Sequence, residues 1–317
     1  IRDSYIESLC IYDLKNDEVI SSLLDLLKNT KNENVLSKQS IFFNNVSAHD
    51  SLKSYISKLI LTDDNVFTKT SACGKTDKLS DFVISGVKSD LMKLEAIANV
   101  KPEDIFQDVS DNDIRDILST MPKWETGKAV KPLDMHWENQ IYELSEFHKE
   151  NGYGMFAKYI AFTWRNHSLF PIAGTDSIKL SDLKNYEIPR QKVVDNTESF
   201  VNGYPANNVL LYGDRGTGKS STVHAVLNEY AKSGLRMIEI SKNDITDLTM
   251  IRELIADSPM KFIIFIDDLC FDSHEDSFGA LKAALEGSLS GKRANTLIYA
   301  TSNRRHLIKE SFSDREL

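Results

Sequence analysis

The sequence predicts an α-helical N-terminal domain followed by an α/β domain with a parallel sheet. Up to about Trp164, apolar residues recur at helical spacing, as in the stretch Val19–Leu27. Farther along the chain, short apolar runs alternate with helical segments, which is the order of parallel strands joined by crossover helices. With 317 residues the chain is long enough for two cores. We therefore expect a helical domain over residues 1–170 and an α/β domain over residues 171–317.

Several segments of the first half have the pattern of individual helices. Helices are expected at Ser89–Ala98, Asp111–Thr120 and Trp137–Glu150, with polar spacers at Asn29–Asn34 and Thr68–Lys78. The aromatic-rich stretch Phe156–Trp164 favours core packing over a cofactor site.

The second half contains four short, nearly continuous apolar runs, as expected for buried parallel strands. These predicted strands are Asn208–Tyr212, Leu235–Ile240, Lys261–Asp267 and Thr296–Ala300. Helices fit between them at Lys219–Lys232, Leu248–Asp257 and Ser277–Leu289. The alternation indicates a sheet covered by helices.

A glycine-rich loop follows the first of these strands. Its glycines let the main chain curl so that N–H groups point at phosphate oxygens, and the helix that follows adds its positive end. The candidate nucleotide-binding residues are Asp214, Arg215, Gly216, Thr217, Gly218, Lys219, Ser220 and Ser221. The alternative interpretation is a glycine-rich turn that only joins a strand to a helix.

The loop predicts ATP or ADP and Mg²⁺ as cofactors. Lys219 is expected to reach the β- and γ-phosphates, and the Ser220 hydroxyl to bind Mg²⁺. Two other glycine patterns are not expected to bind phosphate. Cys73–Thr76 has a lysine where a phosphate loop needs its first glycine, and Gly152–Ala157 follows a helical segment and so indicates a helix–helix turn.

Polar residues at the ends of two later strands complete the candidate site. Asp267 is expected to hold Mg²⁺ opposite Ser220, and Asp268 to orient or polarise the attacking water. Asn303 is the candidate sensor of the γ-phosphate. The alternatives are that the two acids are solvated caps of a loop and that Asn303 is a turn residue. Arg304–Arg305 is interpreted either as a contact to nucleotide or to a neighbouring subunit's site, or as part of an exposed face or of interface salt bridges.

The composition of the chain argues against several classes of protein. A net charge of −9 argues against indiscriminate binding to a phosphate backbone, and three widely spaced cysteines indicate neither a disulfide nor a metal site. We see no apolar run of about twenty residues, so we expect no membrane-spanning segment. We expect a cytoplasmic protein. The chain starts at Ile1 instead of methionine and stops soon after the fourth predicted strand, so we expect a fragment with an incomplete C-terminal domain.

Three motifs taken in order resemble known elements of the AAA+ ATPases. GDRGTGKSS, FIIFIDD and ATSNRRHL look like Walker A, Walker B and sensor 1 of that superfamily. More narrowly, LYGDRGTGKSSTVHAVLNEY, FIDDLCF, LKAALEGSL and YATSNRRHLI are similar to a functionally uncharacterised family of bacterial AAA+ proteins. This resemblance covers roughly Asn151–Ile308.

The resemblance implies a P-loop NTPase fold, a three-layer αβα sandwich with strand order 5-1-4-3-2 counted from the strand before the glycine-rich loop. It places nucleotide at the carboxyl edge of the sheet and the adenine pocket in Ile178–Tyr186, where Leu183 and Tyr186 are the candidates. Their alternative role is ordinary packing on the sheet. A fifth strand, an arginine finger and a lid with a second sensor are not recognisable. Since such a finger serves a neighbouring site, the resemblance also implies a homo-oligomer.

The leading functional hypothesis is an ATPase that remodels or loads a macromolecular partner, protein or DNA. One alternative is a nucleotide-gated switch or loader with little turnover, because Asp268 stands where glutamate is more usual and its side chain is one methylene shorter. Two further alternatives are a small-molecule phosphotransferase and a scaffold with a vestigial site.

Overall fold

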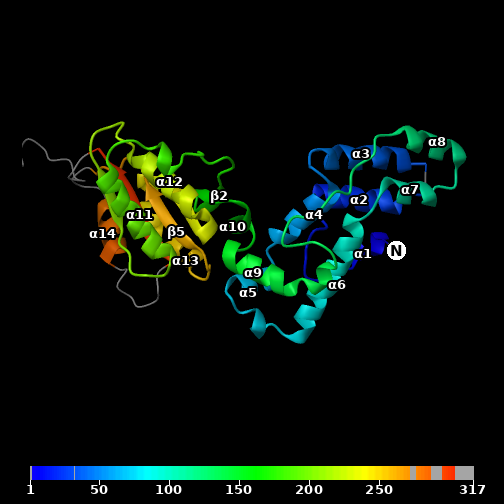
Figure 1. The fold of residues 1–317 in the computed structure, drawn as a ribbon, viewed down its shortest axis with the longest axis horizontal. Coiled ribbons are helices and arrows are strands. Elements are labelled where there is room, and N and C mark those ends of the chain that lie inside the picture. The colour runs from blue at the N-terminus through cyan, green and yellow to red at the C-terminus, as the bar shows by residue number, and fades with distance from the viewer. Residues whose placement is uncertain (1, 32, 272–275, 287–294, 304–317) are drawn as a thin grey trace, which may run out of the picture. The chain divides into compact units, whose positions relative to one another are not determined.

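The computed structural model describes residues 2–31, 33–271, 276–286 and 295–303, and the chain forms two units, 1–149 and 150–317 (Figure 1). The division lies earlier than the predicted boundary at residue 170. The reason is a hairpin of β1 (Ala161–Arg165) and β2 (Ser168–Pro171), which joins the sheet of the second unit.

The first unit is helical, as its apolar spacing predicts. Its helices are α1 (Arg2–Glu7), α2 (Glu18–Lys28), α3 (Val35–Ser47), α4 (Leu52–Leu61), α5 (Val66–Ala72), α6 (Asp81–Ala98), α7 (Pro102–Asp108) and α8 (Asn112–Thr120). Helix α9 (Ile141–Asn151) follows and runs across the division between the units. One apolar cluster, which includes Leu23, Phe42, Leu91 and Trp137, forms the core of this unit. None of the helices in the described ranges is long and apolar enough to cross a bilayer.

Polar side chains set the ends of these helices. Asp17 accepts hydrogen bonds from the N–H groups of Val19 and Ile20 at the start of α2. At α5, Asn65 and Thr68 form a reciprocal capping box. This cap explains one difference from expectation, because the helix that it starts at Val66 runs into the predicted spacer Thr68–Lys78 as far as Ala72.

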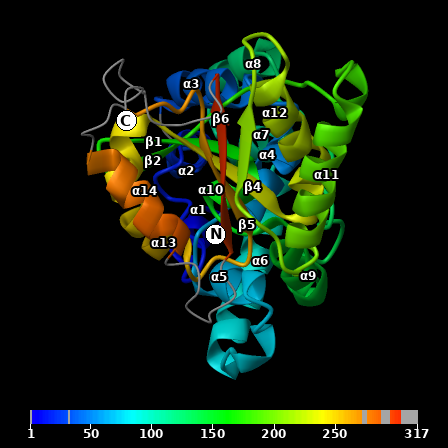
Figure 2. The ribbon, with the colours of Figure 1, turned by 90° about the vertical axis from the view of Figure 1, so that its left-hand side faces the viewer.

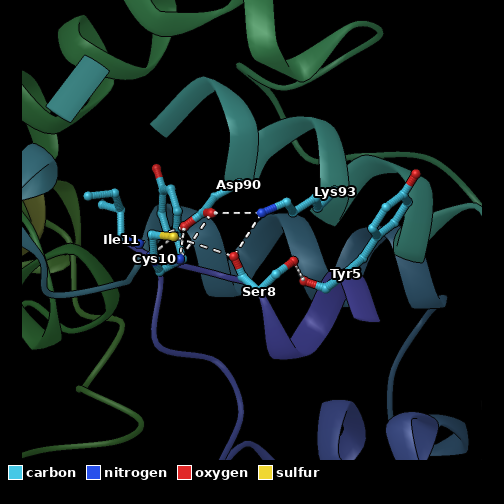
Figure 3. Close-up of polar contacts among 7 residues, drawn as sticks. Tyr5, Ser8, Cys10, Ile11, Asp90 and Lys93 are labelled. Carbon is cyan, nitrogen blue, oxygen red and sulfur yellow. Dashed lines mark hydrogen bonds and ion pairs between the residues drawn. The ribbon is translucent and has the colours of Figure 1, made fainter. Parts of the chain in front are cut away.

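A buried carboxylate ties the segment after α1 to helix α6 (Figure 3). The Asp90 side chain is fully buried, and its Oδ2 accepts hydrogen bonds from the main-chain N–H groups of Cys10, Ile11 and Tyr12 at 2.9, 2.7 and 3.1 Å. Lys93 Nζ lies 3.9 Å from Asp90 Oδ1. Three N–H donors and a nearby ammonium offset the cost of burying this charge.

The second unit contains the predicted parallel sheet. Its strands are β1, β2, β3 (Val209–Tyr212), β4 (Leu235–Ile240), β5 (Lys261–Ile266) and β6 (Thr296–Ser302), in the order β2-β1-β4-β5-β6-β3. Counted from β3, the four predicted strands lie in the order 1-4-3-2 and are parallel, so the expected fold class is confirmed. The expected position of a fifth strand, after β6, falls on residues outside the described part.

Helices cover both faces of this sheet (Figure 2). Helices α11 (Glu187–Val201) and α12 (Lys219–Tyr230) lie on one face, and α13 (Leu248–Ile255) and α14 (Asp276–Glu286) on the other. Alternate residues of β5 point to opposite faces and so belong to different apolar clusters. Ile263 and Phe265 belong to the cluster with α11 and α12, whereas Phe262, Ile264 and Ile266 belong to the cluster with α13 and α14.

The aromatic-rich segment packs in a core, as predicted, but it also supplies a strand. The turn Gly152–Gly154 separates α9 from α10 (Met155–Lys158), which confirms the expected helix–helix turn. Strand β1 then pairs in parallel with β4, and Phe162 and Trp164 are buried. The sheet is therefore wider than the sequence predicts.

A buried arginine anchors the segment before β1. Arg236 on β4 is 3% exposed, and it donates to the carbonyl oxygens of Asn151, Phe156, Ala231 and Leu235. Burial lowers the pKa of Arg236 to about 10. Through its hydrogen bonds to the carbonyl oxygens of Asn151 and Phe156, Arg236 holds the segment between α9 and β1 against the sheet.

Candidate nucleotide-binding site

The glycine-rich loop lies between β3 and α12 and has the backbone conformation that requires glycine. Gly213, Gly216 and Gly218 have φ values of 144°, 76° and 81°. A Cβ added at any of the three meets no atom within 4 Å, so conformation and not crowding selects glycine. Gly218 is the N-cap of α12, which directs the start of that helix into the loop.

Lys219 bridges the loop and the end of β6. Its Nζ donates to the carbonyl oxygens of Gly213 and Asp214 at 2.8 and 2.7 Å and lies 3.3 Å from Oδ1 of Asn303. The Thr217 hydroxyl donates to the same Asp214 carbonyl at 2.9 Å. The ammonium group is thus held at the mouth of the loop, within reach of an anion that the loop would bind.

Ser220 and Asp267 meet at the carboxyl end of the sheet. The Ser220 hydroxyl donates to Asp267 Oδ1 at 2.6 Å, and the Thr301 hydroxyl donates to the same oxygen. Asp267 is exposed, whereas Thr301 is buried. A hydroxyl and a carboxylate oxygen side by side are hard ligands of the kind that Mg²⁺ takes.

Asp268 adopts an unusual backbone conformation. Its φ is 52°, in the left-handed region that non-glycine residues seldom occupy. Its N–H donates to the Thr301 hydroxyl at 2.9 Å, and its Oδ1 accepts from Asn303 Nδ2 at 2.6 Å. The conformation turns the second acid toward Asn303 and away from the line of β5.

A cavity of about 300 Å³ extends from the loop to the segment that leads into α11. Its lining includes the four consecutive residues Leu183–Tyr186 and, from the loop, Gly213, Asp214, Thr217, Gly218 and Lys219. Tyr212, Pro189 and Arg190 also line it. Leu183 and Tyr186, the adenine candidates, therefore lie in the same cavity as Lys219.

The structure brings most of the candidate site residues together. Asp214, Thr217, Gly218 and Lys219 line the cavity, while Ser220, Asp267, Asp268 and Asn303 form the adjacent polar cluster. Arg215, Gly216 and Ser221 belong to the loop and the first turn of α12 but are not among the lining residues. Arg304–Arg305 lies outside the described residues.

Two contributors were not predicted from sequence. Thr301 lies in the ATSNRRHL motif without a predicted role, although its hydroxyl contacts Asp267 and Asp268; its place at the end of an apolar strand is the available signal. Arg190 binds main-chain carbonyl groups of the cavity wall, and such a role has no sequence signature.

A titratable pair lies beside the loop. His224 on α12 and Glu239 on β4 approach to 3.4 Å between Nε2 and Oε1. The hydrogen bond with Glu239 raises the pKa of His224, burial opposes that rise, and the negative charges of Glu239, Asp176 and Asp267 add to it. The ring of His224 also packs edge-on against Phe265, with centroids 5.7 Å apart.

Comparisons with known proteins agree with the AAA+ resemblance. The chain is 27% identical over 145 residues to "Probable mitochondrial chaperone BCS1-A" of Dictyostelium discoideum, covering 38% of this chain and 34% of that protein. It is 36% identical over 67 residues to the replication factor C large subunit of Staphylothermus marinus, covering 21% and 15%. The matches thus span about a third or less of these relatives.

Among solved structures, the chain is similar to a crystal structure of DnaI, with 23% identity and a TM-score of 0.31, over 43% of this chain and 77% of that one. A family model matches residues 157–317, which include the whole sheet, the glycine-rich loop and the acidic strand end. These residues are just over half of the 317-residue chain. The chain belongs to the family described as "Protein of unknown function (DUF815)".

Proposed function

We propose that this protein is an ATPase that binds ATP with Mg²⁺ at the glycine-rich loop and uses nucleotide binding and hydrolysis to act on a macromolecular partner. The observation that carries the proposal is the convergence of Lys219, which lines the cavity, with Ser220 and Asp267 in the polar cluster beside it. Lys219 and Ser220 are neighbours in the chain, whereas Asp267 lies 47 residues after Ser220, and the parallel sheet brings it to the same edge. An ammonium, a hydroxyl and a carboxylate in this arrangement suit a triphosphate and its cation.

The residues present fit a magnesium ion. Ser220 Oγ and Asp267 Oδ1 lie 2.6 Å apart, and Ser220 follows directly after the loop lysine that would bind the phosphates. When bound, Mg²⁺ would neutralise charge on the β- and γ-phosphate oxygens. Thr301 supports the site from behind, because its hydroxyl orients the Asp267 carboxylate.

The remaining side chains suit hydrolysis. Lys219 would bind β- and γ-phosphate oxygens, and Asp268 would accept a hydrogen bond from the water that attacks the γ-phosphorus. The products would be ADP and inorganic phosphate. Asn303, which contacts both Lys219 and Asp268, would orient these two groups relative to the γ-phosphate.

The partner is proposed to be a macromolecule, protein or DNA. Support comes from the names of two relatives, a chaperone and a replication factor C large subunit. The helical first unit is the candidate for partner contact, since the second unit contains the nucleotide cavity.

A nucleotide-gated switch with little turnover is the second candidate. The observation in its favour is Asp268, whose carboxylate is held by Asn303 at 2.6 Å on a left-handed backbone. Since Asn303 holds one oxygen of this carboxylate, the other oxygen would have to orient the water, or Oδ1 would have to accept from both groups.

Calorimetric titration with ATP in the presence of Mg²⁺ tests the proposal. The wild-type protein should bind ATP, and Lys219→Ala should lower the affinity at least tenfold, since a phosphate-binding ammonium is lost. Lys232→Ala is the matched control, because Lys232 is exposed and follows the far end of α12. ATP binding that is equally strong in wild type and Lys219→Ala would refute the assigned site, and measured phosphate release would separate the ATPase from the switch.

A further inference from the structure

The part of the cavity lining formed by residues 183–186 contains a strained turn. Asn185 and Tyr186 are consecutive non-glycine residues with φ values of 64° and 56°. L-residues disfavour this left-handed region because Cβ approaches the main chain, and two in succession need outside support. Both residues line the cavity, so their backbone conformation determines its shape.

Arg190 provides that support through its guanidinium fork. Nη1 donates to the carbonyl oxygen of Leu183 at 2.5 Å, and Nη2 donates to that of Asn185 at 2.6 Å. The Arg190 side chain is only 12% exposed, whereas the nearby Glu187 carboxylate, 3.8 Å away, is 78% exposed. The principal polar contacts of the fork are therefore the two carbonyl groups of the turn.

The other end of the same segment is attached to the helix that begins at the glycine-rich loop. Asn228 on α12 donates from Nδ2 to the carbonyl oxygens of Asp176 and Ile178 at 2.7 and 2.9 Å. The segment thus has two side-chain anchors, one on α12 and one on α11. Only the Arg190 anchor lies within the cavity wall.

We propose that Arg190 is a positioning residue for the base end of the nucleotide, fixing residues 183–186 in the conformation that receives the nucleoside while the glycine-rich loop receives the triphosphate. This inference rests on the proposed function and deepens it. With the phosphates at Gly213–Lys219, the rest of the cavity is available to the nucleoside, and its lining includes the turn that Arg190 holds. A preorganised wall avoids the entropy cost of ordering four residues on binding.

Arg190 should affect binding of the nucleoside and not of the triphosphate. The test therefore compares ATP with inorganic tripolyphosphate, each titrated in the presence of Mg²⁺. Arg190→Lys keeps the positive charge but cannot span two carbonyl groups as a fork. Arg190→Gln removes the charge. Both variants should lose about tenfold in ATP affinity and stay within about twofold of wild type for tripolyphosphate.

Lys192→Gln is the control, because it removes one positive charge from an exposed position of the same helix outside the cavity. It should leave the ratio of the two affinities unchanged. Retained tripolyphosphate binding also shows that a variant has folded with an intact loop. A second variant, Asn228→Ala, releases the other anchor and should shift the same ratio in the same direction.

Two results would overturn the role of Arg190. One is an equal loss for ATP and tripolyphosphate in Arg190→Gln with no loss in Arg190→Lys, which would assign Arg190 to the phosphates by its charge. The other is unchanged ATP affinity in both variants, which would leave the proposed ATP site standing. Wild-type protein that binds neither ligand would instead refute the nucleotide site, and this inference with it.

Discussion

Asn303 Nδ2 donates a 2.6 Å hydrogen bond to Asp268 Oδ1, and the Oδ1 atom of the same asparagine lies 3.3 Å from Lys219 Nζ. One amide therefore links the proposed base to the proposed phosphate-binding ammonium. The three residues come from the ends of two strands and the start of α12, and they meet because those ends share one edge of a parallel sheet.

Replacement of this amide should affect turnover more than binding. Asn303→Ala is expected to lower kcat for ATP hydrolysis by about 10- to 100-fold, because Asp268 and Lys219 lose their common orienting group. ATP affinity should change less than about threefold. Steady-state phosphate release and calorimetry measure the two quantities, with exposed Asn44→Ala as the control. A loss confined to affinity would contradict the orienting role.

Asp268 itself should be needed for hydrolysis and not for binding. An amide cannot accept the proton of the attacking water, so Asp268→Asn should reduce kcat by about 100-fold or more while ATP still binds. Single-turnover assays with radiolabelled ATP measure the chemical step directly. Wild-type turnover in Asp268→Asn would remove this residue from the mechanism, and negligible turnover in wild type would favour the switch.

Chelation of Mg²⁺ should weaken ATP binding. Asp267 and Asp268 are both exposed at the loop, and without a cation their charges repel the triphosphate. Calorimetry with and without EDTA should show the loss in wild type and a smaller loss in Asp267→Asn, which lacks one of the repelling charges. Equal ATP affinity under both conditions in wild type would argue against a metal at Ser220 and Asp267.

The Asp90 carboxylate should be a large contributor to the stability of the first unit. Asp90→Asn places an NH₂ group among main-chain N–H donors in a fully buried position, at a cost of about 3 kcal/mol. Chemical denaturation of the full chain measures this change. Asp113→Asn is the control, since that side chain is exposed on α8. A difference from wild type no larger than the control's would show that the three hydrogen bonds add little.

His224 should make stability depend on pH in a defined direction. Its pKa is raised in the folded protein above the ordinary value of 6.5, mainly by the hydrogen bond with Glu239, so folding favours the protonated form. The contribution is complete below pH 6.5 and is lost as pH rises through the raised pKa. The stability difference between wild type and His224→Gln should thus shrink with rising pH, by roughly 1 kcal/mol or less. A difference that grows with pH would contradict this assignment.

The sequence by itself determined the local elements of the second unit. Buried parallel strands are nearly continuous apolar runs, so β3, β4, β5 and β6 were found close to their observed bounds. The glycine-rich loop was equally recognisable, because its left-handed residues admit little except glycine. The prediction that the acids after β5 and the asparagine after β6 belong to one site used the rule that the carboxyl ends of neighbouring parallel strands lie at one edge of the sheet.

Only the tertiary structure decided the features that depend on distant partners. Strand β1 lies in an aromatic segment whose sequence pattern did not predict a strand, and it becomes a strand by pairing with β4. The turn at Asn185 and Tyr186 contains no glycine and is held by Arg190 through main-chain oxygens, which every residue type possesses. The left-handed backbone of Asp268 likewise depends on Thr301 at the end of the neighbouring strand β6 and on Asn303, which follows that strand. Contacts to main-chain atoms and across strands leave no periodic trace in a sequence, and for that reason they had to be seen in the folded chain.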